Sequence, residues 1–422
     1  MDGGQARFGG RHRLDDQVDQ VPDIPIGQRV RFYREAQGKS QSVVAGLASI
    51  SDEYLSMIEL GKKTPTIGTL HRIAQVLSVR IGELLGEPRF QLDTPQHIDA
   101  MIEMQRALTT YPSSTVPAPH DVDQLGNGVA SAWMTWHTSA TRFSEVAATL
   151  PGLLVQGESY VRGLGAPGDV ESRRVVWRHL SDAYALAQEF TRRVGRADLN
   201  LLAADRCTRA AEDADDALRM VKGRWNMAHA LLGDQQPEGT IEVCRRAIEE
   251  TRPRLSDAPL EWTAMCSQLF LPIVRATARQ GAGRTARELL GESASPLARQ
   301  VGDRLVLWMV SGPVNVAIHA VSLEMEIGNG AEGLRLGEAI ELDRALSIER
   351  KTTLLIELAR CHEYRRDYAM VLHCLLRVEG LAPEDIRYHE LTRTMVRNLV
   401  AQSKPAYRGD AQALAQRVGL AG

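Results

Sequence analysis

Between residues 26 and 85, apolar side chains recur three or four positions apart, which is the spacing of one face of a helix. Five such stripes follow one another: Ile26, Val30 and Tyr33; Val44 and Leu47; Leu55 and Ile58; Leu70, Ile73, Ala74 and Leu77; Ile81, Leu84 and Leu85. Each stripe is short, so the pattern predicts five short helices that share one small core.

Residues that begin and end helices lie between these stripes. Gly38 ends the first helix, and Ser40 can cap the second, since a serine hydroxyl accepts from N–H groups that have no partner in the first turn. Ser51 can cap the third helix in the same way, while Gly61 ends it and Pro65 prevents its continuation. The second and third helices then form a helix-turn-helix, an arrangement whose main use is to place a short helix in the major groove of DNA.

From about residue 123 to the end, the apolar pattern is helical throughout, and no convincing strand alternation is present. Helix pairs recur at roughly 35 to 45 residues, separated by Gly, Pro and Asp. The units begin near the following residues: Val129, Val175, Ala217, Leu260, Pro313 and Ile348. The clearest pair spans residues 352–382, and Pro383 ends it before a further helix over Arg387–Ala401. The repeat predicts a stack of helix pairs, an α-solenoid.

Changes in composition divide the chain into five segments. They are a Gly-rich, charged and disordered arm (1–25), a helix-turn-helix domain (26–86), a linker with one helix (87–124), a helical-repeat domain (125–403) and a C-terminal tail helix (404–422). The predicted fold class is therefore all-α, with a five-helix helix-turn-helix domain followed by an α-solenoid.

The net charge of −3 is unevenly distributed. Residues 26–85 hold eight Lys/Arg and five Asp/Glu, which is +3, so the remainder carries −6. A basic small domain and an acidic large one fit DNA binding at one end of the chain. The five cysteines are odd in number and form no C-x-x-C, and no apolar run approaches the ~18 residues that span a membrane. We therefore expect a protein of the reducing cytoplasm, with no membrane partner.

Residues 26–85 resemble the XRE family of phage-repressor-type DNA-binding domains. The matching positions are Ile26-Gly27, Arg34, Gly38, Ser40-Gln41, Ala45, Ser51, Tyr54-Leu55-Ser56, Ile58-Glu59, Gly61-Lys62, Pro65, Leu70, Ala74 and Leu77. Because many positions agree at fixed spacing, this resemblance is more specific than a short motif. It implies a domain that binds double-stranded DNA.

The resemblance also implies roles for individual residues. Those expected to contact DNA are Gln41 on the backbone, Asp52, Glu53 and Met57 toward base edges, Ser51, Tyr54 and Ser56 beside them, and Lys62 and Lys63 on phosphates. Arg34 and Glu59 match a family ion pair that ties the first helix to the third. Family members often carry Gln, Arg or Asn in place of Asp52 and Glu53. The Asp52 carboxylate can accept from cytosine N4 or can favour the positive end of the helix dipole, and both roles stay open.

The helix pairs resemble degenerate tetratricopeptide (TPR) repeats. Their combination with the N-terminal domain resembles actinobacterial regulators and, more loosely, the peptide-sensing RRNPP regulators. This resemblance implies a transcriptional regulator that binds a two-half-site operator as a homodimer, with a repeat domain that senses a peptide, a small molecule or a protein. The alternative is a protein-interaction scaffold in which the TPR-like domain binds a partner protein. It is motivated by the acidic recognition helix.

Two of the repeat units carry an Asn and a His three or four positions apart, so that each pair lies on one helix face. The amides could bond the backbone of a bound peptide, and nearby tryptophans could stack on it. The candidate effector-binding residues are Trp225, Asn226, His229, Trp308, Asn315 and His319. The alternative is that the polar pairs face solvent and the tryptophans pack between helices.

Patterns for catalysis or metal binding are weak. Cys361-His362 and His373-Cys374 look like metal ligands, but adjacent helical residues point about 100° apart and the spacing misses zinc patterns. The sequence has no G-x-S-x-G, no P-loop and no H-E-x-x-H. We therefore expect no enzyme activity, no cofactor and no metal.

Overall fold

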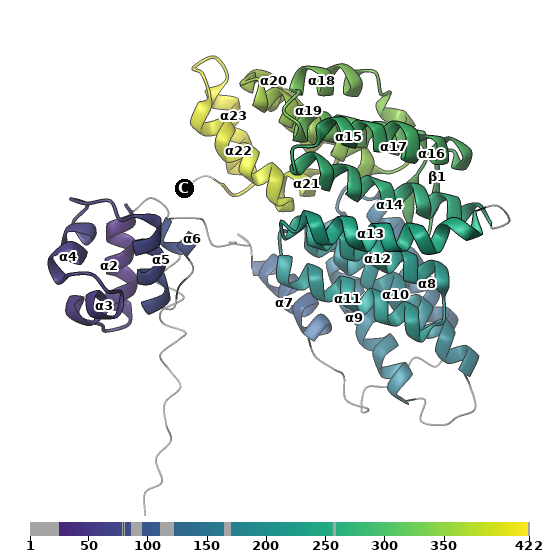
Figure 1. Ribbon diagram of the computed structural model, residues 1–422, viewed down its shortest axis with the longest axis horizontal. Helices are drawn as coiled ribbons and strands as arrows, with labels where there is room; N and C mark the ends of the chain where they lie inside the picture. Colours follow the sequence, from purple (N-terminus) through teal and green to yellow (C-terminus); the bar gives the residue numbers. More distant parts are fainter. Residues whose placement is uncertain are drawn as a thin grey trace, which may run out of the picture. The chain divides into compact units, whose positions relative to one another are not determined.

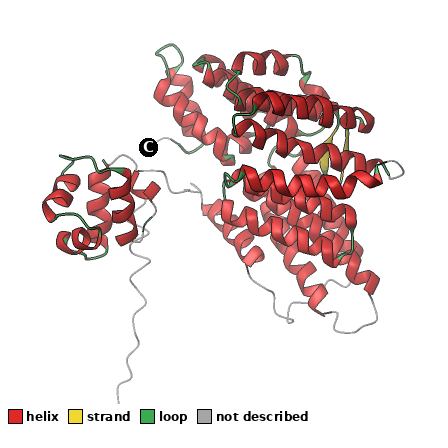
Figure 2. Ribbon diagram, in the orientation of Figure 1, coloured by secondary structure: helices red, strands yellow, loops and turns green. Residues whose placement is uncertain are grey.

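The computed structural model describes residues 25–77, 79, 81–85, 95–109, 122–163, 170–255 and 259–420. The chain divides into two compact units, Met1–Asp93 with Gly422 and Thr94–Ala421. Helices dominate both units (Figure 1, Figure 2). The arm that the sequence predicts over residues 1–25 lies, apart from Pro25, outside the described residues.

The first unit contains the five predicted helices (Figure 1). They are α2 (Ile26–Ala36), α3 (Gln41–Leu47), α4 (Asp52–Glu59), α5 (Ile67–Val76) and α6 (Ile81–Leu85). The hydroxyls of Ser40 and Ser51 accept from the N–H groups of Val43 and Tyr54, at 3.3 and 3.1 Å, so both predicted N-caps are confirmed. Thr66 caps α5 in the same way. The side chains at these helix starts thus satisfy N–H groups that would otherwise have no partner.

One apolar core holds the five helices together, and its buried members include Val30, Val44 and Leu55. α2 lies very close to α4 at Gly27, where an added Cβ would be only 1.9 Å from the carbonyl oxygen of Ile58. This position therefore requires glycine, and the close approach fixes how the recognition helix α4 sits on the domain.

The second unit is an array of helices with one short hairpin (Figure 1, Figure 2). Its elements are α7 (Pro95–Thr109), α8 (Val122–Thr138), α9 (Arg142–Gly163), α10 (Val170–Arg193), α11 (Ala197–Asp213), α12 (Ala217–Gly233), α13 (Pro237–Thr251), η1 (Arg252–Arg254), α14 (Leu260–Arg279), α15 (Gly283–Glu288), η2 (Leu289–Ala294), α16 (Ser295–Val301), β1 (Arg304–Val306), β2 (Met309–Ser311), α17 (Pro313–Glu326), α18 (Gly330–Glu338), η3 (Leu342–Arg344), α19 (Ile348–Tyr364), α20 (Tyr368–Leu381), α21 (Pro383–Tyr388), α22 (Glu390–Gln402) and α23 (Arg408–Arg417). Among the described helices, none has the length and apolar character needed to cross a membrane.

Consecutive helices of this unit pack against each other, as expected of a helical-repeat domain. Four predicted unit starts coincide with helix starts, namely those of α12, α14, α17 and α19. α8 and α10 begin earlier than predicted, at Val122 and Val170. The first turn of α10 is mostly polar, and in α8 the apolar stripe already begins before Val129, at the buried Leu125. The first helix of each pair is thus α8, α10, α12, α14, α17 or α19, which we call the inner helices.

Two local predictions are wrong. A strand pair does exist, since β1 and β2 form an antiparallel hairpin with Leu305 opposite Val310. Its strands are three residues long, too short for alternation to be visible in the sequence. The predicted stop at Pro383 is confirmed, since α20 ends at Leu381 and Pro383 opens the separate helix α21, where proline needs no N–H partner. The helix expected over Arg387–Ala401 begins only at Glu390.

The two ends of the array are joined. α8 packs against α19, and α9 packs against α21, although these elements are far apart in the sequence. Arg142 at the start of α9 forms a buried ion pair with Asp385 on α21. Beside it, the Glu384 carboxylate accepts from the N–H groups of Phe143 and Ser144, at 2.8 and 3.1 Å. We call these contacts the closure. They bring the first and last inner helices around a shared interior.

Candidate nucleic-acid interface and ligand cavity

The exposed face of α4 is the candidate recognition surface. Its first residues, Asp52 and Glu53, follow the Ser51 cap and are exposed. Tyr54, Ser56 and Met57 are half-buried, and Leu55 and Ile58 face the core. The two carboxylates lie in the first turn, where they favour the positive end of the helix dipole. In that position they are also at the end of the helix that normally approaches base edges, so both interpretations of Asp52 stay open.

Two lysines lie directly after this helix. The backbone N–H groups of Lys62 and Lys63 both donate to the carbonyl oxygen of Met57, at 2.8 and 3.1 Å. The chain is therefore held at the C-terminal end of α4, and both lysine side chains are exposed. Exposed ammonium groups in such a place can contact phosphates, which position a domain on DNA without reading sequence.

Behind the recognition surface, Glu59 connects three helices. Arg34 on α2 donates to both carboxylate oxygens, at 2.7 and 2.9 Å, and the hydrogen bond raises the pKa of Arg34. The amide of Gln41, at the start of α3, donates to the same carboxylate at 2.7 Å. Gln41 therefore has one amide N–H committed inside the domain, and only its second N–H is free for the predicted backbone contact.

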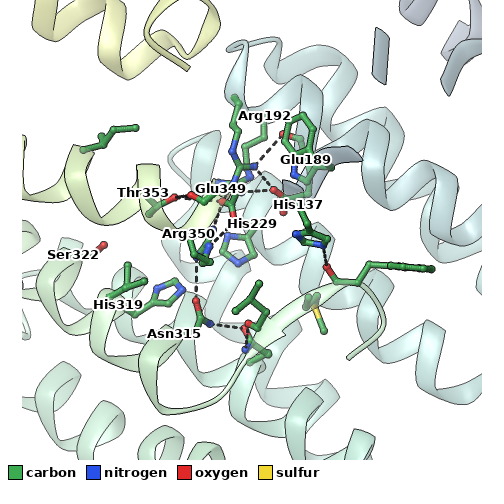
Figure 3. Close-up of a pocket in the computed structure, with 18 of the residues that line it drawn as sticks. His137, Glu189, Arg192, His229, Asn315, His319, Ser322, Glu349, Arg350 and Thr353 are labelled. Atoms are coloured by element: carbon green, nitrogen blue, oxygen red, sulfur yellow. Dashed lines mark hydrogen bonds and ion pairs between the residues drawn. The ribbon is translucent and has the colours of Figure 1, made fainter. Parts of the chain in front are cut away.

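In the second unit, the inner helices surround a cavity of about 200 Å³ (Figure 3). Its wall is completed by the β1–β2 hairpin and the start of α22. All six of the predicted effector-binding residues line it: Trp225, Asn226, His229, Trp308, Asn315 and His319. The two asparagines do not face open solvent, as the alternative interpretation expects, because Asn226 and Asn315 are only 1% and 2% exposed.

A network of charges crosses the cavity (Figure 3). Glu189 accepts from Arg192 at 2.7 Å and also from Arg193. Arg193 extends to Glu349 on α19, and Glu349 accepts from Arg350 at 2.6 Å. Burial opposes ionisation of both carboxylates, but the adjacent guanidinium groups outweigh it and hold the pKa of Glu189 and of Glu349 well below the usual range. The network therefore stays charged, and it links α10 to α19.

Neutral imidazoles lie among these charges. Burial lowers the pKa values of His137, His229 and His319, and the neighbouring arginines lower those of the last two further. At neutral pH each ring thus offers one N–H donor and one bare nitrogen acceptor. His137 uses its Nε2 on the Trp308 carbonyl oxygen at 2.9 Å, and the Trp308 ring stacks on Trp133 with centroids 6.2 Å apart.

Trp308 reaches the cavity from a strained turn. Leu307 and Trp308, which join the two strands, have φ angles of +46° and +66°. Two successive positive φ angles are typical of tight hairpin turns, but Asn and Gly are the residues that adopt them readily. Because neither Leu307 nor Trp308 favours this backbone conformation, we infer that the contacts of Trp308 with Trp133 and His137 hold it there.

Several charged residues of this site were missed by sequence reasoning, namely Glu189, Arg192, Arg275, Glu349 and Arg350. The available signal was their location on inner helices otherwise rich in apolar residues. A charge at such a position is unusual unless it is paired or bound. Glu189 and Arg192 pair within α10, but Arg193 pairs with Glu349 on α19, several repeats away, and that contact has no local signal in the sequence.

Comparison with known proteins addresses the first unit. A family model described as "Helix-turn-helix" matches residues 30–84. An HTH-type transcriptional regulator of Sinorhizobium fredii, y4dJ, is 35% identical over 60 residues, which cover 14% of this chain and 78% of that protein. The chain belongs to the HTH-type transcriptional regulators. Its first unit is accordingly a DNA-binding domain.

Two other similar proteins are matched over a smaller share of their own length or at a lower sequence identity. SinR of Bacillus subtilis is 41% identical over 63 residues, 15% of this chain, and the chain spans 57% of the length of SinR. A crystal structure of PlcR from Bacillus thuringiensis, solved with the peptide PapR7 and DNA, covers 66% of this chain and 96% of PlcR, at 15% identity and a TM-score of 0.28.

Proposed function

We propose that this transcriptional regulator binds a two-half-site operator as a homodimer and that its helical-repeat unit binds an effector in the central cavity. The DNA-binding part of the proposal rests on the exposed face of α4 and on the lysines that follow it. Paired half-sites are the usual targets of such domains, because a protein two-fold axis matches a palindromic operator.

The observation that carries the effector part is the convergence of polar groups in one cavity. The six predicted residues and the charged network of α10 and α19 meet there, and each of the six inner helices contributes side chains to the lining. A cavity with a few convergent polar groups and indole walls is the usual form of a small-ligand site. Its volume of about 200 Å³ favours a small molecule or the end of a short peptide over a folded protein.

The test of the regulator is capture of fragmented genomic DNA by the purified full chain at physiological salt, followed by sequencing. We expect a small set of fragments that share a two-fold motif. Glu53→Ala combined with Lys62→Ala should abolish their enrichment, because these changes remove one candidate base contact and one phosphate contact. The matched control is Arg284→Ala with Glu288→Ala, an exposed pair on α15 with the same two charge types.

The control should enrich the same fragments as the unmodified protein. Enrichment that survives in the α4 double variant would contradict the assigned readers. Absence of any shared motif would favour the scaffold alternative, in which a partner protein of the repeat unit is the main target. Sedimentation of the protein with a captured fragment would report whether two copies bind per operator.

A further inference from the structure

Four basic groups form a row along one side of the cavity. They are Arg192 on α10, His229 on α12, Arg275 on α14 and His319 on α17, one from each of four successive inner helices. All four side chains line the same cavity, and both arginines lower the pKa values of both imidazoles. Figure 3 shows Arg192, His229 and His319 around a common space together with Arg350.

The cavity wall has an excess of positive charge. Its cations are Arg192, Arg193, Lys222, Arg275, Arg350 and Arg360, and its anions are Glu189, Glu349 and Glu357. Two carboxylates that pair with these cations from outside the cavity do not cancel the excess positive charge, because each of them also pairs with a second cation. Asp182 binds Lys222 at 3.3 Å and also Arg219 at 2.8 Å. Glu326 binds Arg275 at 3.0 Å and also Arg279 at 3.3 Å, and neither Arg219 nor Arg279 lines the cavity.

Polar atoms in this row have no partner among the residues that the structure describes. They are Arg192 Nε, His229 Nε2, Arg275 Nε and His319 Nδ1, with Asn226 Oδ1 and His137 Nδ1 nearby. The guanidinium Nε–H groups are donors only, and a neutral imidazole can turn its N–H toward an acceptor. His229 and Asn226 are 6% and 1% exposed, so bulk water does not satisfy them. Buried donors without partners are costly and call for a bound acceptor.

The two asparagines are less suited to clamp a peptide backbone, because both are already engaged. Asn226 Nδ2 donates to the Cys207 sulfur at 3.2 Å. Asn315 accepts from Arg350 at 3.2 Å and donates to Gln268 at 3.5 Å. The unsatisfied groups are thus mainly those of the arginines and histidines.

We propose that the cavity binds a small organic anion, whose carboxylate or phosphate group lies between Arg192 and Arg275 and accepts from His229 and His319. This inference rests on the proposed effector site and names the chemistry of its ligand. Arginine is suited to carboxylate and phosphate oxygens, because its N–H groups match their geometry. Trp225 and Trp308 would cover the apolar part of the ligand, since both rings line the same cavity.

The structure offers a matched pair of variants. Arg275 and Arg279 lie one turn apart on α14 and both bind the Glu326 carboxylate, but only Arg275 lines the cavity. Arg275→Gln and Arg279→Gln therefore remove the same charge and the same type of internal ion pair. Only the first should change anion binding.

The experiment is titration calorimetry of the full chain without DNA, with citrate or inorganic phosphate as the probe and chloride at equal ionic strength as the reference. We expect saturable binding of at least one probe, and the tighter one distinguishes a carboxylate from a phosphate site. Arg275→Gln should weaken its affinity at least tenfold, while Arg279→Gln should change it less than twofold. Circular dichroism of both variants would verify that they fold.

Absence of saturable binding by both probes would overturn the inference, and so would equal weakening by the two variants. The assay contains no DNA, so its result is independent of the regulator proposal. If the anion binds but operator affinity never responds to it, the anion site stands and the sensing function fails. If the operator is bound but neither probe binds, the regulator stands and the anion inference fails.

Discussion

The closure between α9 and α21 offers a quantitative test of how the repeat unit is held together. Arg142 is 0% exposed, and the ion pair with Asp385 is its charge partner. Its Nε and Nη1 atoms have no partner within the described part of the chain, although the guanidinium lies 5.1 Å from the centre of the Trp136 ring. Burial lowers the pKa of Arg142 and raises that of Asp385, so desolvation opposes both charges.

Asp385→Ala would leave the Arg142 cation buried without a counter-charge. Removal of one member of a buried pair costs about 3–5 kcal/mol. Thr352 would also lose its 3.1 Å bond to Asp385 Oδ1, which contributes about 1 kcal/mol. We therefore expect the free energy of unfolding of the repeat unit to fall by about 4 kcal/mol or more. Arg142→Leu combined with Asp385→Leu removes both desolvation costs and should cost less than either single change.

The assay is urea unfolding of the full chain, followed by tryptophan fluorescence, for Asp385→Ala, for Arg142→Leu and Asp385→Leu singly, and for the double variant. Glu379→Ala is the control, because its partner Arg417 is 2.8 Å away on a largely exposed surface, and we expect a loss of about 0–1 kcal/mol there. A loss below about 1 kcal/mol for Asp385→Ala, or a double variant that loses the sum of the single losses, would refute the reasoning.

Three further predictions concern single positions. Gly27→Ala places a Cβ 1.9 Å from the Ile58 carbonyl oxygen and should cost about 3 kcal/mol in thermal unfolding of the first unit, whereas Gly46→Ala, with nothing within 4 Å, should stabilise α3 by about 0.5–1 kcal/mol. Equal effects would contradict the close approach. Lys62→Ala should weaken all operator sequences alike and reduce the salt slope of log affinity by about 1, as measured by anisotropy between 50 and 200 mM salt. A loss confined to one sequence would instead indicate base reading. Burial lowers the pKa of His229, so the unfolded chain binds a proton there below pH ~6.5 and the folded chain does not. The free energy of unfolding is therefore higher above that pH and falls as the pH is lowered. His229→Asn should reduce this loss by about 1 kcal/mol per pH unit between pH 6 and 5. If denaturation at pH 6 and pH 5 gave the same pH dependence for the variant and the unmodified protein, the prediction would be wrong.

The first unit could be predicted closely because its signals are local. The Ser40 and Ser51 caps and the five apolar stripes each lie within a few residues of the structure that they determine. The inner helices of the second unit could be located for the same reason, since an apolar stripe predicts a helix wherever the helix packs. All six effector-binding candidates line one cavity. Five of them lie on α12 and α17, whose equivalent faces meet the same interior, whereas Trp308 comes from the hairpin.

What could not be predicted depends on contacts between distant segments. Arg142 pairs with Asp385, and Arg193 pairs with Glu349, across several intervening repeats, so these contacts depend on how the whole array is curved. The periodicity of the sequence predicts the helices but not the contact between the two ends of the array. The β1–β2 hairpin was also missed, because Leu307-Trp308 lacks the Asn-Gly type of signal and its φ angles are imposed by packing.

The same long-range contacts explain how a ligand in the cavity could act beyond it. An effector changes DNA affinity only if it binds two arrangements of the protein with different affinity. Arg192 shares Glu189 with Arg193, and Arg193 reaches Glu349 on α19, so an anion on Arg192 acts on the network that connects α10 to the last inner helix. Asp385 belongs to the same electrostatic cluster, since both Arg193 and Glu349 influence its pKa. Ligand binding and closure of the array therefore involve the same group of charges, and we expect a ligand that neutralises Arg192 to change the stability of the closure.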